Sequence, residues 1–260
     1  METDEKIYAA IDQLIEDYGP AVAAFAQYPA RLRDKTAVAA EAFGSGFFVS
    51  YDARTFLVTA NHVVEDARDS ETGAVLSINN GAFPLEGLKF ATDSEADIAV
   101  ALMDPLLKRH DKSVATIPWS IPEHPYVGIP IGVFYGFPST KNFISPGLNR
   151  DKFRLYGVTI EERENTFRSI VPPVKKPICF QFSRTKMHAG KNLHPQSRTA
   201  PIPYGMSGGP VLRVYGKQGG SPTSLQAGLI GVGVRWLEQD AGLVAADISN
   251  IWPLINDLIK

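Results

Sequence analysis

Apolar and polar positions alternate with a period of two along most of the chain, a pattern that predicts short β-strands. From about residue 36, short apolar runs are separated by turn residues such as Asp52-Ala53 and Asn79-Asn80-Gly81. Many short strands with turns between them are typical of an all-β barrel or sandwich. We predict about ten strands without intervening helices, at 45–50, 55–60, 73–78, 97–103, 127–136, 152–160, 177–183, 209–215, 226–235 and 242–247.

The two ends of the chain follow a helical period instead. Residues 4–18 place apolar side chains at spacings of three and four, and Gly19-Pro20 is expected to end that helix. We expect it to pack against the strands, with a covering or docking role as the alternative. Residues 249–259 predict a second helix, with Pro253 in the first turn, where a missing N–H costs little.

Composition indicates a soluble globular protein with a sizeable core. The 260 residues are 44% apolar and 21% charged, and 22 glycines and 19 prolines suit a turn-rich β protein. The net charge of −2 gives no argument for binding nucleic acid. Residues 139–198 hold 12 Lys/Arg against 4 Asp/Glu. We interpret this excess as a solvated loop face, with a basic rim for an acidic partner as the weaker alternative.

The single cysteine and the absence of targeting signals predict a cytoplasmic protein. Cys179 cannot form an intramolecular disulfide, and its apolar surroundings indicate a core thiol. The first residues, Met-Glu-Thr-Asp-Glu-Lys, do not resemble a secretory signal. No stretch approaches the roughly 20 apolar residues of a membrane span. We therefore expect no membrane partner.

Three short motifs carry candidate chemistry. His62 follows a β pattern in Leu-Val-Thr-Ala-Asn-His-Val-Val, and Asp97 begins a strand in Glu-Ala-Asp-Ile-Ala-Val-Ala-Leu. Ser207 lies between glycines in Gly-Met-Ser-Gly-Gly-Pro-Val-Leu. Asp93 and Glu95 are neighbouring alternatives to Asp97.

These residue types fit nucleophilic catalysis. A serine hydroxyl is a poor nucleophile until a base removes its proton, and a histidine titrates near neutral pH. A buried carboxylate holds the imidazole in one tautomer and stabilises its charge. The oxyanion that forms needs donors already in place, and the N–H groups of Gly205 and Ser207 are the best candidates.

Together the motifs resemble those of chymotrypsin-like serine proteases, namely Thr-Ala-x-His, Asp-Ile/Leu-Ala and Gly-x-Ser-Gly-Gly-Pro, in that family's order. The spacings are 35 residues from His62 to Asp97 and 110 from Asp97 to Ser207. Residues 44–49, 127–138 and 228–234 resemble further family strands. The last of these, which includes Gly233 and Val234, borders the specificity pocket in the family. The nearest likeness is to the cysteine-poor, intracellular bacterial branch.

The resemblance implies an all-β fold, a chymotrypsin-like double β-barrel with an N-terminal and a C-terminal helix. It assigns residues 1–35 to the helix and a linker, 36–115 to a first barrel with His62 and Asp97, 116–247 to a second barrel with Ser207, and 248–260 to the C-terminal helix. It also implies acyl-enzyme chemistry on Ser207, without metal or cofactor. Only 13 residues follow Asp247, too few for the appended peptide-binding domain of bacterial stress proteases.

The chain departs from the family pattern at informative positions. Met206 stands where digestive members have an aspartate that orders the oxyanion loop after activation. Val234 stands near the position where many members have a serine beside the catalytic aspartate. Pro201 to Tyr204 are expected to line the primary specificity pocket and offer no charge, which favours an uncharged substrate side chain.

The sequence thus predicts a serine endopeptidase acting on protein or peptide substrates, restrained by its own loops or by a regulatory protein partner. Two alternatives remain open: a protease-fold binding module without turnover, and an esterase or acyl transferase that uses the same residues. The remaining histidines, His110, His124, His188 and His194, are expected to be structural or surface residues. With Cys179 they show no metal-ligand spacing.

Overall fold

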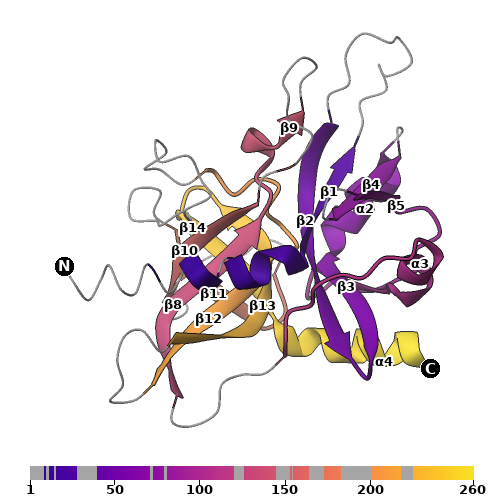
Figure 1. Cartoon of the computed structure of the whole chain (residues 1–260). Coiled ribbons are helices and arrows are strands. Elements are labelled where there is room, and N and C mark those ends of the chain that lie inside the picture. The colour runs from indigo at the N-terminus through magenta and orange to yellow at the C-terminus, as the bar shows by residue number, and fades with distance from the viewer. Residues whose placement is uncertain are drawn as a thin grey trace.

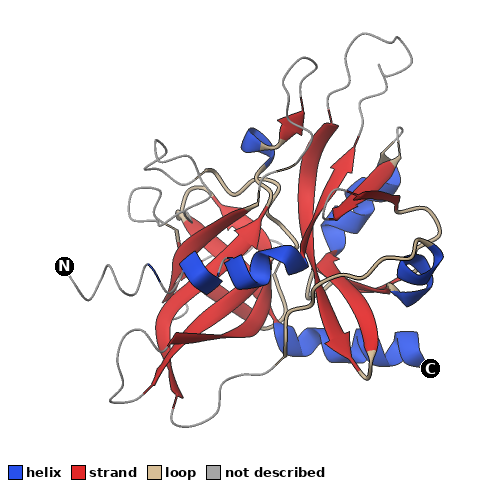
Figure 2. Ribbon diagram, in the orientation of Figure 1, coloured by secondary structure: helices blue, strands red, loops and turns tan. Residues whose placement is uncertain are grey.

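The computed structural model shows two β-sheet units side by side, with helices around them and the N-terminal helical segment across the front of the molecule in this view (Figure 1). It describes residues 9, 12–14, 16–27, 40–70, 73–78, 81–119, 126–144, 153, 155–163, 173–182, 201–217 and 225–260. His124, His188 and His194 lie outside the described residues. Figure 2 shows that strands form most of both units.

The first unit, hereafter the first sheet, is antiparallel, with strand order β5-β4-β1-β2-β3-β7-β6 and with β9 paired to β2. Its strands and helices are β1 (Val22–Gln27), β2 (Ala40–Tyr51), β3 (Arg54–Ala60), α2 (Asn61–Asp69), β4 (Ala74–Ile78), β5 (Gly81–Pro84), β6 (Phe90–Asp93), β7 (Ile98–Leu102), α3 (Asp104–Arg109) and β9 (Phe143–Ile144). The β2–β3 hairpin turns at Asp52 and Ala53, both with positive φ, as tight hairpin turns require.

The second unit, hereafter the barrel, is a closed six-stranded barrel of order β10-β11-β14-β13-β12-β8. Its strands are β8 (Tyr126–Gly136), β10 (Tyr156–Arg163), β11 (Pro177–Gln181), β12 (Pro210–Lys217), β13 (Leu225–Leu237) and β14 (Gly242–Asp247). Single 3₁₀ turns lie at η1 (Gly19–Ala21), η3 (Ser139–Lys141) and η4 (Ile248–Asn250).

Three sequence predictions need correction. The stretch 1–35, predicted to be helix and linker, contains β1, which pairs with both β2 and β4. Helices α2 and α3 interrupt the strands, although no helix was predicted between them. The resemblance implied a barrel for the first unit. Among the described strands, β5 and β6 end an open sheet and do not pair with each other.

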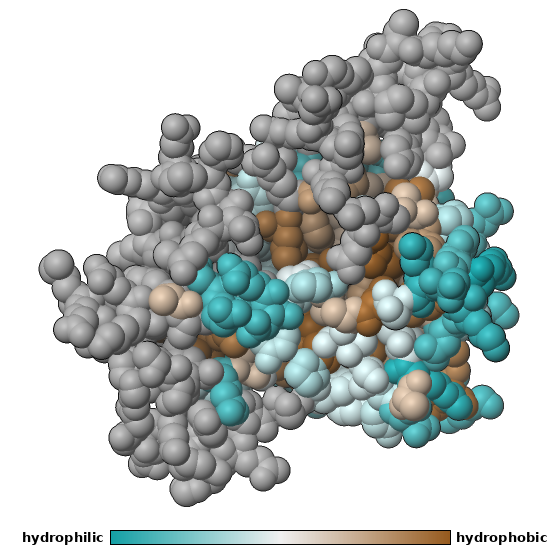
Figure 3. Space-filling view, in the orientation of Figure 1, coloured by the Kyte–Doolittle hydropathy of each residue, from teal (hydrophilic) through white to brown (hydrophobic). Residues whose placement is uncertain are grey.

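Both terminal helices were predicted. Among the described residues of the first helix, 9, 12–14 and 16–18 are helical, and η1 follows at Gly19. The side chains of Gln13, Glu16 and Asp17 are exposed, and Figure 3 shows a hydrophilic patch where this segment crosses the molecule. At the other end, α4 (Ile251–Ile259) carries Pro253 in its first turn and packs on β6 and β7.

The hydrophobic core holds the two units together. Along β8, Phe134 points into the barrel and packs with Met206 and Val211. Its neighbours Val133 and Tyr135 point the other way, into a larger core shared with the first sheet. Because successive strand side chains face opposite sides, one strand contributes to both cores. The barrel is therefore apolar inside and also on the face turned toward the first sheet.

Helix α4 should contribute measurably to stability through this core. Ile255 is fully buried, so Ile255→Ala removes apolar contacts and leaves a cavity, at a cost of about 2–5 kcal/mol of unfolding free energy. The exposed neighbour Asn256 provides the control, and Asn256→Ala should change stability by less than about 0.5 kcal/mol. Urea unfolding of both variants checks this. Equal stability of the two would contradict the packing described for α4.

Candidate active site

His62 is placed by the abrupt change from β3 to α2. Strand β3 ends at Ala60 and α2 begins at Asn61, so His62 lies in the first helical turn. The first N–H groups of a helix have no partner within it. Here Asn61 N–H donates to the Asp97 carbonyl at 3.0 Å, and His62 N–H donates to Asp97 Oδ1 at 3.0 Å. Asp97 thus accepts hydrogen bonds from the first two N–H groups of the helix that carries His62.

The same carboxylate holds the imidazole ring. Asp97 Oδ2 lies 2.8 Å from His62 Nδ1, and the Asp97 side chain is 13% exposed against 38% for His62. An ionised carboxylate can accept hydrogen bonds but cannot donate them. Asp97 therefore favours the His62 tautomer that carries its proton on Nδ1. Nε2 then remains available to accept a proton. Of the three acidic candidates in this stretch, Asp97 is therefore the one joined to His62.

The turn before β7 fixes where Asp97 sits. Asp97 has a φ of +57°, a left-handed conformation that aspartate tolerates better than most residues. Asp93 Oδ1 accepts the N–H groups of Glu95 and Ala96, both at 3.0 Å, and so closes this turn. Asp93 therefore supports the turn and does not compete for His62.

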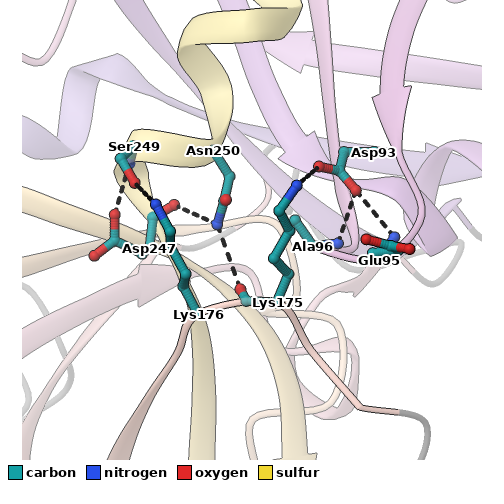
Figure 4. Close-up of polar contacts among 8 residues, drawn as sticks. All are labelled: Asp93, Glu95, Ala96, Lys175, Lys176, Asp247, Ser249 and Asn250. Carbon is teal, nitrogen blue, oxygen red and sulfur yellow. Dashed lines mark hydrogen bonds and ion pairs between the residues drawn. The ribbon is translucent and has the colours of Figure 1, made fainter.

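The barrel contacts this turn through Lys175 (Figure 4). Lys175 N–H donates to the Glu95 carbonyl at 2.8 Å, and its ammonium lies 3.3 Å from Asp93 Oδ2. On its other side, the Lys175 carbonyl accepts from Asn250 Nδ2 at 3.4 Å, just before α4. The second unit and the C-terminal helix thus both reach the segment that carries Asp97.

Ser207 lies in a loop that only glycines permit, hereafter the nucleophile loop (residues 203–209). Gly205 and Gly208 have φ values of +83° and +87°, which side chains rarely adopt. A Cβ on Gly208 would overlap the Ser45 carbonyl oxygen and the Thr59 hydroxyl, and one on Gly209 would overlap the Tyr135 carbonyl. The glycines around Ser207 therefore let the loop lie directly against β2, β3 and β8.

Two N–H groups of the loop have no acceptor among the described residues. The Tyr204 carbonyl accepts from Ser139 N–H at 2.7 Å, and the Met206 carbonyl accepts from Gly209 N–H at 3.0 Å. The N–H of a trans peptide points opposite to its C=O. Gly205 N–H and Ser207 N–H therefore point away from those partners, and neither finds an acceptor among the described residues. Two free amides beside a serine form the arrangement expected of an oxyanion hole.

Met206 explains how the loop is ordered without the aspartate of digestive proteases. Its side chain is fully buried inside the barrel with Phe134 and Val211. Its N–H donates to the Pro203 carbonyl at 2.9 Å. Apolar burial thus holds the residue next to Ser207, where the digestive enzymes use an ion pair.

These groups meet in one cavity of about 400 Å³ at the junction of the two units. It is lined by Asn61, His62, Glu65, Ser94, Asp97, Pro203, Tyr204, Gly205, Ser207, Val234, Arg235 and Trp236. Of the residues predicted to bind substrate, Tyr204 and Val234 line it. Pro201 is buried outside the lining. Gly233 supports the nucleophile loop instead, because its carbonyl accepts from Gly208 N–H and its N–H donates to Gly209.

Sequence reasoning missed several residues of the site. Glu65, Ser94, Arg235 and Trp236 lie in its lining, and Glu238 accepts a hydrogen bond from the Tyr204 hydroxyl at 3.1 Å. Glu65 comes three positions after His62, and residues at that spacing share a helix face. A prediction of helix α2 would therefore have placed Glu65 beside His62. The lining therefore carries charge that the Pro201–Tyr204 segment alone does not show.

The proton-transfer contact itself is not formed in this structure. Among the described residues, no hydrogen bond joins the His62 ring to the Ser207 hydroxyl, although both line the same cavity.

A larger cavity of about 540 Å³ lies beside α2 and β4, but its lining contains neither histidine nor cysteine.

The family can now be stated. The profile of the trypsin-like peptidase domain matches residues 44–220, which is more than half of the chain. The chain belongs to the trypsin-like peptidase family. The match spans β2 to the end of β12 and so includes His62, Asp97 and Ser207. No curated protein matches the chain.

A solved structure confirms the chymotrypsin-like fold. The chain is similar to an HtrA-type protease, a variant of AlgW with a decapeptide, at 16% identity and a TM-score of 0.54. That likeness covers 97% of this trypsin-like chain and 66% of the other, so the chain spans just under two thirds of AlgW. The inactive form of the Rv3671c protease is also similar, at 14% identity and a TM-score of 0.47, covering 96% of this chain and 94% of that one.

Four further features belong to the described part of this trypsin-like chain. No three His, Cys, Asp or Glu side chains there lie close enough together to hold a metal ion. None of the described helices is long and apolar enough to cross a membrane. Cys179 is a buried free thiol, as predicted, and burial raises its pKa. His110 packs edge-on against Phe83, as expected of a structural residue.

Gly208→Ala should destabilise the protein far more than a matched glycine variant. Gly87 has nearly the same φ, +84°, but a Cβ there would meet no atom within 4 Å. Gly87→Ala therefore adds only backbone strain, whereas Gly208→Ala adds strain and steric overlap. We expect the unfolding free energy to fall by at least about 2 kcal/mol more for Gly208→Ala. Urea unfolding measures both; equal losses would show that the loop does not lie against β2 and β3.

Glu238 should control the ionisation of Tyr204. The hydrogen bond to Glu238 and the charge of that carboxylate raise the pKa of the Tyr204 phenol. Glu238→Gln removes the negative charge that disfavours phenolate, so the Tyr204 pKa should fall toward its ordinary value. NMR titration of ¹³Cζ-labelled tyrosine, assigned with Tyr204→Phe, measures the change. An unaltered titration would mean that the two side chains do not meet in solution.

Proposed function

We propose that the chain is a serine endopeptidase with Ser207 as nucleophile, His62 as general base and acid, and Asp97 as the residue that orients His62. The observation that carries this proposal is the 2.8 Å contact between Asp97 Oδ2 and His62 Nδ1, in a cavity that Ser207 also lines. Family membership supports the reaction class, and the two free amides beside Ser207 support acyl transfer.

The proposed reaction has two halves. Ser207 Oγ bonds to the substrate carbonyl carbon while its proton passes to His62 Nε2, and the carbonyl oxygen becomes an oxyanion facing Gly205 and Ser207 N–H. The C–N bond then breaks, His62 returns the proton to the leaving amine, and an acyl group remains on Ser207. Water repeats the sequence, giving up a proton to His62 and releasing the acid, so that Ser207 regains its hydroxyl proton.

A peptide is the proposed substrate class. The related HtrA-type protease was solved with a decapeptide, which supports peptide binding on this fold. Val234, Arg235 and Trp236 of β13 line the cavity, and β13 shifts register against β14 between Gly233 and Arg235. Its backbone therefore leaves the regular ladder beside Ser207, where an extended peptide could pair with it. A regulatory protein partner remains part of the proposal.

The compartment is also proposed. The single thiol, Cys179, is buried and forms no disulfide, and a protein without disulfides gains nothing from an oxidising environment. This supports the cytoplasm as the site of action.

A second function is favoured by one observation. Because no hydrogen bond joins His62 to Ser207 here, a binding module that retains the fold without turnover would also fit. Such contacts often tighten only when substrate binds, so this geometry is equally expected of a resting protease. The experiment below separates the two.

Asp97→Asn should abolish most activity while preserving the fold. The asparagine oxygen can still accept from the backbone N–H of His62. An amide NH₂ group in place of Oδ2 can only donate, so it no longer favours the His62 tautomer that activates Ser207. We expect kcat/KM on a denatured protein or ester substrate to fall about 10³- to 10⁴-fold, and Ser207→Ala to fall at least as far. Fluorophosphonate labelling rates should follow the same order.

Glu95→Gln is the matched control for this experiment, because Glu95 is exposed, lies two positions away and was itself a sequence candidate. Its activity should stay within about twofold of wild type. Wild-type protein that neither cleaves nor labels under any activating condition would reject the protease and favour the binding module. Cleavage of esters but never of peptides would favour the esterase.

A further inference from the structure

The inference concerns Ser45, a residue of β2 to which the proposed mechanism gives no role. It lies between Gly44 and Gly46, is fully buried, and belongs to the first sheet. Its neighbours across the junction are the nucleophile loop and the residues that follow β8. Buried polar side chains are kept only where they are hydrogen-bonded, so each partner of Ser45 is informative.

The proton of the Ser45 hydroxyl can be assigned without ambiguity. Phe137 N–H lies 2.9 Å from Ser45 Oγ and can only donate. The Gly205 carbonyl lies 2.9 Å from the same oxygen and can only accept. The single hydroxyl proton must therefore point to Gly205. One side chain of the first sheet thus joins the end of β8 to the nucleophile loop of the barrel.

The Ser45 backbone makes a second contact with the same loop. Ser45 N–H donates to the Ser207 carbonyl at 2.8 Å. The carbonyls of Gly205 and Ser207, which alternate along the loop, are therefore both held against β2. The remaining Ser45 group, its carbonyl, accepts from the buried hydroxyl of Thr59 at 2.7 Å, so every polar group of Ser45 has a partner.

Hydrogen bonds on both sides of Gly205 restrict the two peptides that flank it. Gly205 is bounded by the 204–205 peptide, whose carbonyl is held by Ser139, and by the 205–206 peptide, whose carbonyl is held by Ser45. Rotation of the 204–205 peptide would carry Gly205 N–H out of the position expected for an oxyanion donor. A glycine resists such rotation less than any other residue, so the contacts on either side of it must supply the resistance.

We propose that Ser45 is a positioning residue for the oxyanion hole: its hydroxyl, between Phe137 N–H and the Gly205 carbonyl, keeps Gly205 N–H directed at the reacting centre. Ser45 does not touch substrate. This role rests on the proposed function, because it matters to chemistry only if Ser207 is acylated. Its structural part, the order of the nucleophile loop, does not depend on turnover.

Ser45→Ala tests the proposal, with Thr59→Val as the matched control. Both remove one buried hydroxyl from the same pair of strands. Thr59 packs against Gly208, but its hydroxyl donates to the Ser45 carbonyl and not to the loop, so the similarly shaped valine keeps this packing and leaves the loop's hydrogen bonds in place. In Ser45→Ala we expect kcat to fall about 10- to 100-fold with KM changed less than about threefold, since a misplaced donor weakens transition-state stabilisation more than substrate binding. Fluorophosphonate labelling should slow by a similar factor, and Thr59→Val should stay within about threefold of wild type.

A second readout works even without turnover. Hydrogen exchange of peptides covering residues 203–209, measured by mass spectrometry, should accelerate in Ser45→Ala and remain near wild type in Thr59→Val. If exchange accelerates in Ser45→Ala but the wild-type protein is never labelled by fluorophosphonate, Ser45 orders the loop and the protease is rejected. Unchanged exchange and labelling in Ser45→Ala would overturn the role of Ser45 while leaving the protease intact. Equal effects of both variants would also overturn it, because the hydroxyl would then act through general stability.

Discussion

The close approach of the nucleophile loop to β2, β3 and β8 is the constraint on which the rest of the site depends. The loop carries Ser207 and the two free amides, and it lies where a Cβ on Gly208 or Gly209 would overlap neighbouring backbone. Because the loop belongs to the barrel and its support at Ser45 belongs to the first sheet, the two units must be docked before the site exists. The apolar core that both units share thus has a functional consequence.

Asp97 is positioned differently, by the turn before β7 and by its contacts with α2. Asp97 satisfies the first amides of α2 and holds the His62 ring with the same carboxylate, so helix position and imidazole orientation are set together. Val234, predicted to stand near the position where many family members have a serine, lines the same cavity as Asp97, and its side chain offers no hydrogen bond. Contact from the barrel reaches Asp97 indirectly, through Lys175 and the turn closed by Asp93. Support thus comes through the backbone of the turn.

The sequence predicted the fold class, and the structure brings His62, Asp97 and Ser207 of the three motifs to one cavity. Motifs in family order report on local structure as well as chemistry. The sequence prediction missed elements whose burial on both faces or short length left no clear alternation of apolar and polar residues. Strand β1 is small and apolar on both faces, Ala-Ala-Phe-Ala at its centre, so it shows no alternation and was taken for a linker. Helices α2 and α3 span nine and six residues, too short for a helical period to stand out beside strong strand signals.

The site's supporting residues were missed for a related reason. Ser45 appears in the sequence only as a small residue between glycines, and its role arises from backbone groups of segments 92 and 160 residues away in the chain. Trp236 likewise reaches the cavity, and Glu238 reaches the Tyr204 hydroxyl, through the path of β13 and the residue after it, which no local pattern specifies. Met206 was recognised as a departure, but only the structure shows that burial inside the barrel replaces the missing ion pair.

The central claim is that the hydroxyl of Ser207 becomes covalently acylated. The most direct measurement is acid quenching of the protein during turnover of a slowly hydrolysed ester or peptide, followed by mass mapping of the protein. The account predicts an acyl group on the peptide that contains Ser207. Turnover with the acyl group on another residue, or with none trapped on Ser207 under any quench, would contradict it.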